Sequence, residues 1–67
     1  MKYIKLVNTS GKEVFIFIDK IIYVANTVNK CIASIGLEGQ EPLLIDIGPY
    51  DDPASNIIKQ IEEILNK

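Results

Sequence analysis

Three aspartates near the C-terminal third of the chain, Asp46, Asp51 and Asp52, are the side chains closest to a chemical cluster. Carboxylate oxygens are the ligands that Mg²⁺ and Ca²⁺ prefer, so this segment is a candidate cation site. Its spacing matches no calcium-binding loop, and Asp52 directly precedes Pro53, which suits it to cap a helix. The pattern favours a solvated connector followed by a helix cap. We therefore assign no metal ligand, and whether the aspartates bind a cation stays open at this point.

The remaining reactive groups indicate a protein that is not an enzyme. The chain has no histidine, which removes the commonest general base and excludes Ser-His-Asp and Cys-His arrangements. Its one cysteine, Cys31, falls in the middle of a predicted strand on the core side, where a packed thiol is the expected role. The glycines are too widely spaced for a phosphate-binding loop. We predict no catalytic residues and no cofactor.

Length and composition predict one small domain that gains stability from an apolar core or from self-association. The 67 residues are 48% hydrophobic, and a single cysteine cannot form an internal disulfide. Met1 and Lys2 lead directly into apolar residues without a signal-peptide pattern, so we expect a cytoplasmic protein without membrane association. The net charge is −2 and arginine is absent, which argues against nucleic acid as a partner.

Hydrophobic periodicity predicts an α+β fold. We expect an antiparallel meander of four to five strands, strongly twisted or barrel-like, with one C-terminal amphipathic helix packed on it. Asp19 and Lys20 interrupt the apolar pattern and predict a tight bend or a single helical turn. The expected strands cover residues 3–8, 12–18, 21–26, 30–37 and 42–47, and the expected helix covers residues 53–66.

Turn signals suggest how the strands pair. A three-residue loop at residues 9–11, with Gly11 at its end, predicts Asn8 opposite Lys12 and Tyr3 opposite Phe17. A tight turn at residues 26–29 would place Val24 opposite Cys31. Aligning the apolar faces of the last two strands would place Ile35 opposite Ile45.

The helix is expected to cover the aliphatic face of the sheet. Its apolar residues follow the spacing of one helical face: Ala54, Ile57, Ile58, Ile61, Ile64 and Leu65. Just before it, Tyr50 is expected to fill the corner between the sheet and the helix.

The second sheet face collects aromatic and aliphatic residues that one helix cannot reach. A monomer seldom exposes so much apolar surface, so we predict a protein-interaction or regulatory module that forms a homo-oligomer through this face. Another protein partner would also fit. Burial in a closed small fold is the main rival, and a nucleic-acid-associated regulator is the alternative function. The predicted interface residues are Tyr3, Phe15, Phe17, Tyr23, Ile32 and Leu44.

Three short motifs resemble the FlbD-like small flagellar and swarming motility proteins. They are Ile4–Lys5–Leu6, Gly11–Lys12–Glu13 and the run Ile18–Val24, followed by an amphipathic helix. The resemblance implies the strand–strand–helix order and a motility-related accessory role, and it implies no catalytic residues. The chain differs at residues 46–52, where that family tends to carry a Val-Lys-Glu-Ser entry to the helix. A small bacterial protein outside that family is equally compatible with these features.

Overall fold

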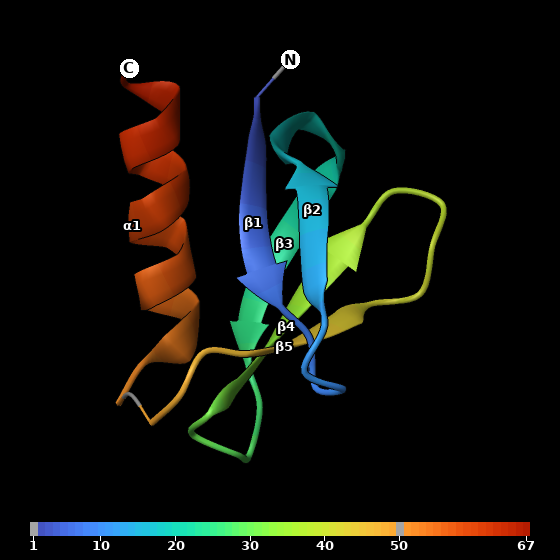
Figure 1. Cartoon of the computed structure of the whole chain (residues 1–67), viewed down its shortest axis with the longest axis vertical. Helices are drawn as coiled ribbons and strands as arrows, with labels where there is room; N and C mark the ends of the chain where they lie inside the picture. The colour runs from blue at the N-terminus through green and yellow to red at the C-terminus, as the bar shows by residue number, and fades with distance from the viewer. Residues whose placement is uncertain (1, 50) are drawn as a thin grey trace.

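The computed structural model describes residues 2–49 and 51–67 and shows an α+β fold, as predicted. The described residues form antiparallel strands in two sheets, followed by one C-terminal helix. Figure 1 shows the β1–β2 hairpin in front of the second sheet, with α1 alongside. The elements are β1 (Tyr3–Val7), β2 (Glu13–Phe17), the 3-10 helix η1 (Ile18–Lys20), β3 (Ile21–Asn26), β4 (Ile32–Leu37), β5 (Leu43–Asp46) and α1 (Pro53–Leu65).

The β1–β2 hairpin has the register that the turn sequence predicts. Tyr3 pairs with Phe17, and the Asn8 N–H donates to the Lys12 carbonyl at 2.9 Å. The Asn8 side-chain oxygen accepts the N–H groups of Ser10 and Lys12, both at 3.0 Å, and Gly11 adopts a φ of 81°. A short polar loop with a left-handed glycine therefore fixes which residues of the two strands face each other.

The second sheet has the strand order β3-β4-β5, but its registers differ from the expected ones. Val24 pairs with Ile35 rather than with Cys31, because the connection after Asn26 is longer than a tight turn. A register shift between Ile21 and Tyr23 changes the pairing only at the start of β3. Ile45 pairs with Ala33 rather than with Ile35. Both errors shift the pairing by an even number of residues, so the faces of the strands stay as predicted.

The two sheets share one hydrophobic core but do not close into a barrel, so the barrel-like expectation was wrong. Helix η1 forms at the interruption made by Asp19 and Lys20 and separates the sheets. Among the described residues, a single isolated antiparallel bridge, between Asn8 and Ile45, connects the two sheets by strand-type pairing. The buried core residues come from both sheets and from α1: Ile4, Leu6, Ile16, Ala33, Ile35, Ile45, Ile57 and Ile61.

Helix α1 contacts β1, β3 and β4 and is held at both ends by side chains. At its N-terminus, Asp52 accepts the Ser55 N–H at 3.1 Å, and Asn26 of β3 accepts the Ala54 N–H at 2.8 Å. At its C-terminus, the Lys2 ammonium donates to the carbonyl groups of Ile64, Leu65 and Lys67, at 3.0, 3.1 and 3.0 Å. The predicted role of Tyr50 lies outside the described residues.

Candidate interaction surfaces

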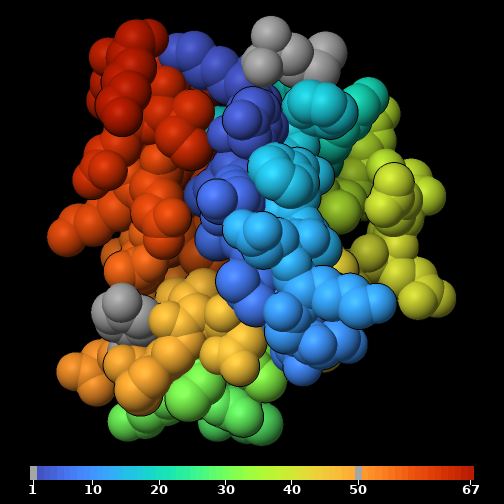
Figure 2. Space-filling view, in the orientation of Figure 1, coloured from blue at the N-terminus to red at the C-terminus, as the bar shows by residue number. Residues whose placement is uncertain are grey.

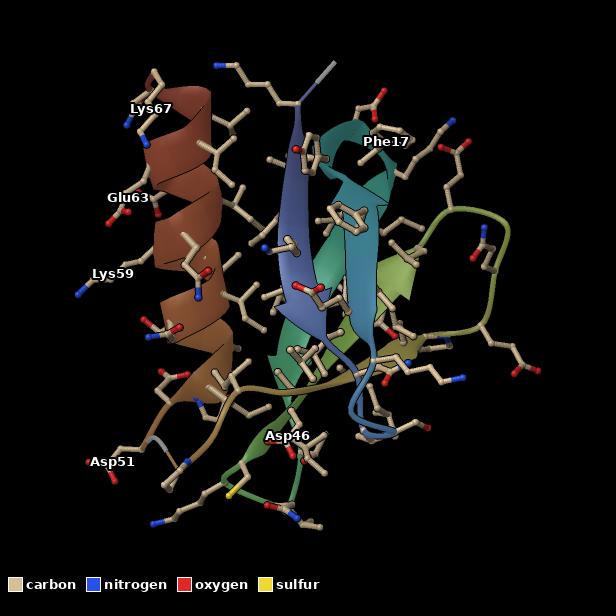
Figure 3. All side chains as sticks on the ribbon, viewed as in Figure 1. Phe17, Asp46, Asp51, Lys59, Glu63 and Lys67 are labelled. Carbon is tan, nitrogen blue, oxygen red and sulfur yellow. The ribbon has the colours of Figure 1, made fainter. Side chains whose placement is uncertain are left out.

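The outer face of the β1–β2 hairpin carries three of the predicted interface residues. Tyr3, Phe15 and Phe17, here called the aromatic surface, are 50%, 61% and 48% exposed. Alternation along the strands turns Ile4 and Ile16 into the core and these rings to the outside. The Tyr3 and Phe15 rings lie 5.6 Å apart with their planes tilted by 53°, a favourable aromatic geometry. Figure 3 labels Phe17 at the front of the molecule, beside η1.

The charges beside the aromatic surface are paired with each other. The Lys5 ammonium lies 3.3 Å from the Glu13 carboxylate, and both side chains are more than half exposed. Such a pair is weak in water, but it leaves no net charge among the three rings. Base stacking on these rings would need a surrounding cationic groove, which one neutralised lysine does not provide.

The other three predicted interface residues lie on a different surface. Tyr23, Ile32 and Leu44 belong to the outer face of the β3-β4-β5 sheet. Alternate residues of β4 share a face, so Ile32 lies on the same face as Ser34 and Gly36. Tyr23 pairs with Gly36 and Leu44 pairs with Ser34, so both lie on that face as well. The outer faces of two sheets that share a core point away from each other. The structure divides the six residues between two sheets, whereas the prediction placed them on a single sheet, and their role as interface residues stays a prediction.

Tyr23 covers Gly36 on this second surface. A Cβ atom at Gly36 would collide with the Tyr23 ring, so the ring occupies the space that a side chain on the central strand would fill. Gly36 is buried although its backbone needs no left-handed conformation. Tyr23 is still 46% exposed, and it has a packing role that the sequence pattern did not suggest.

A groove of about 590 Å³ runs between β2 and the β4–β5 connection. Figure 2 shows it as the hollow between the cyan β2 strand and the yellow-green residues that follow β4. Its floor and walls combine apolar side chains with a few polar ones at the rim. The lining residues are Val14, Phe15, Ile16, Phe17, Lys20, Leu37, Glu38, Gly39, Gln40 and Leu43.

One edge of β2 forms a wall of this groove. Hydrogen bonds of Asn8 to Lys12 and of Ile18 to Lys2 mark the two ends of the β1–β2 ladder. Between these two ends, successive residues of β2 point their backbone N–H and C=O groups alternately toward β1 and away from it. The groups of Glu13, Phe15 and Phe17 point away from β1. Among the described residues β2 pairs with β1 alone, so the groups on this edge have no strand partner. The Phe17 C=O differs from the others, because Phe17 is the N-cap of η1 and its carbonyl is placed to accept the first bond of that helix. Sequence reasoning missed this edge because no residue type marks which side of a strand stays unpaired.

The candidate cation ligands are not gathered into a site. Among the described residues, no three His, Cys, Asp or Glu side chains lie close enough to hold a metal ion. Figure 3 shows Asp46 and Asp51 well apart. The Asp46 carboxylate accepts the Gly48 N–H at 3.1 Å. Hydrogen bonds from the Asn26 amide and the Ser55 N–H hold the pKa of Asp52 below its ordinary value.

Cys31 differs from its expected place. It precedes β4 instead of lying within it, and its thiol is half-buried. Its N–H donates to the Asn29 side chain at 2.8 Å, and its carbonyl accepts the Ile47 N–H at 2.9 Å. The first bond belongs to the turn that lengthens the β3–β4 connection, and the second continues the pairing of β4 with β5.

The comparisons with known proteins add no relative. No family model, curated protein or solved structure matches the chain, so the resemblance to the FlbD-like proteins stays a prediction. In the part of the chain that the structure describes, no helix has both the length and the apolar character needed to cross a membrane.

Proposed function

We propose that this protein is a non-enzymatic interaction module that self-associates through the aromatic surface. The observation that carries the proposal is the exposure of Tyr3, Phe15 and Phe17 on one face of a two-stranded sheet. Large aromatic side chains dominate the energetics of protein interfaces, whereas isolated exposed apolar residues need no explanation. Three neighbouring rings beside a neutralised ion pair have the composition of an interface core with a polar rim.

The physical reason for association is the removal of these rings from water. Full burial of an aromatic side chain removes about 150–250 Å² from solvent. Since the three rings are about half exposed, they offer roughly 300 Å² per copy and roughly 600 Å² in a pair, which corresponds to about 15 kcal/mol at ~25 cal/mol per Å² before the costs of association. These costs are of the same order, so we expect a weak oligomer with a micromolar dissociation constant.

Sedimentation equilibrium across a micromolar concentration series tests the proposal, and we expect reversible association. Phe17→Lys should dissociate the oligomer, because it places a charge beside Tyr3, while circular dichroism should show the helix intact. Val28→Lys is the matched control, because Val28 is fully exposed in the β3–β4 connection. A protein that stays monomeric throughout the series contradicts the proposal, and so does a Phe17→Lys oligomer of unchanged affinity.

A further inference from the structure

The aromatic surface alone is too small for a stable pair. Its roughly 300 Å² per copy compares with about 800 Å² per partner in a standard interface. Any second copy must therefore also cover surface beside the rings. The groove next to β2 is that surface, because Phe15 and Phe17 belong to both.

The chemistry of the groove selects an extended backbone as its occupant. Along one wall, Glu13 and Phe15 present N–H and C=O groups without a strand partner, and Phe17 adds its N–H. Leu37 and Leu43 supply apolar lining. A strand that lies beside β2 satisfies the backbone groups and covers the apolar residues at the same time. Five residues of strand span about 17 Å, the length of β2 itself.

We propose that the occupant is β2 of a second copy, paired antiparallel with β2 about a two-fold axis at Phe15. The inference rests on the proposed self-association and specifies its geometry. The two hairpins then form one four-stranded sheet in the order β1-β2-β2-β1. An isologous contact of this kind closes as a dimer and leaves no further free edge on β2.

The register follows from matching the outward-pointing groups and the charges. Centring the pair on Phe15 places each Phe15 opposite its counterpart and each Glu13 opposite Phe17, so every free group of β2 finds a partner. A centre at Ile16 would place Glu13 opposite Asp19, which lies in η1 and offers no extended backbone for the Glu13 groups to pair with. In the Phe15 register, Glu13 instead arrives at the end of the groove lined by Phe17 and Lys20, where its charge is complemented.

This arrangement also completes the aromatic surface. Cross-strand neighbours on one face interact directly or diagonally, so the Phe15 and Phe17 rings of both copies meet across the new pair. The Lys5–Glu13 ion pairs lie beside them. The rings that are about half exposed in one copy therefore become the centre of a two-copy interface.

Disulfide formation between introduced cysteines tests the register, in a Cys31→Ser background. Phe15→Cys should cross-link with itself, because residues directly opposite in such a pair have Cα atoms about 5.5 Å apart. Glu13→Cys is the matched control on the same strand: two copies of residue 13 would be about 13 Å apart, beyond disulfide reach. A mixture of Glu13→Cys and Phe17→Cys should give the mixed disulfide. We expect these products to form at least about tenfold faster than from Val28→Cys.

The outcomes separate the inference from the proposed function. If the unmodified protein is monomeric in sedimentation, both are wrong. If it associates, but neither Phe15→Cys nor the mixture cross-links faster than Val28→Cys, the edge pairing is wrong and self-association stands. Rapid self-cross-linking of Glu13→Cys would also overturn the Phe15 register. The mixture keeps the test decisive should Phe15→Cys weaken the pair, and circular dichroism confirms folding of each variant.

Discussion

Replacing Gly36 by alanine should destabilise the fold through a single contact with Tyr23. A Cβ atom at this position would overlap the Tyr23 ring, so the ring must leave its place over β4. The ring is 46% exposed, and its displacement uncovers roughly 100 Å² of buried surface, which is worth about 2.5 kcal/mol at most. Allowing for partial repacking, we expect a loss of about 1–3 kcal/mol in the free energy of unfolding.

Thermal and chemical denaturation, followed by circular dichroism, measure this loss. For a domain of this size, 1 kcal/mol corresponds to a shift of about 4–8 °C in Tm, so Gly36→Ala should lower Tm by roughly 5–20 °C. Ser34→Ala, on the same face of the same strand, is the matched control and should change Tm little.

A double-mutant cycle with Tyr23→Ala isolates the contact. Without the ring, the three atoms nearest to the new methyl group are removed, and alanine is favoured over glycine in a strand interior by about 0.5–1 kcal/mol. Gly36→Ala should therefore become neutral or stabilising in the Tyr23→Ala background. If it costs the same in both backgrounds, the ring is not what excludes a side chain at this position, and the reasoning is refuted.

Three further perturbations test other features. Because the Asp52 pKa is depressed in the folded state, its stabilising contribution should be present above the unfolded pKa of about 3.9 and disappear as the pH falls through the folded pKa. Asp52→Asn should therefore flatten the acid side of a Tm–pH profile, and an unchanged profile would contradict the capping role. Lys2→Met should cost about 0.3–1 kcal/mol and raise amide hydrogen exchange in the last turn of α1, whereas Lys59→Met on the solvent side should not. The nucleic-acid alternative predicts salt-sensitive retardation of a labelled oligonucleotide; we expect none at low salt, because Lys5 is paired with Glu13.

The parts of the fold set by local chemistry could be predicted. The Asn8–Gly11 sequence predicts a short hairpin loop with a left-handed glycine, and the length of that loop determines the register of β1 and β2. The helix followed from its spacing and from Asp52 before Pro53. The β3–β4 register depends on a longer turn stabilised by Asn29, and the pairing of Ile21 depends on a register shift in β3. No short-range pattern specified either feature.

The candidate interface could be predicted only in part. Alternation along β1 and β2 correctly indicated that Tyr3, Phe15 and Phe17 share an exposed face. Tyr23 and Leu44 lie in the other sheet, because the chain passes through η1 into β3, and no alternation pattern specified this division. The free edge of β2 depends on where that second sheet lies, and this is a tertiary property rather than one of residue type.

The Lys2 ammonium that caps α1 has a consequence for any added sequence. It brings the two ends of the described chain to the same end of the molecule, as Figure 1 shows. A label or fused domain attached before Lys2 or after Lys67 would therefore emerge beside η1, remote from the Asn8–Gly11 turn. The same proximity makes the chain a candidate for circular permutation: a short linker could join the ends, and new termini could be opened in the exposed β4–β5 connection.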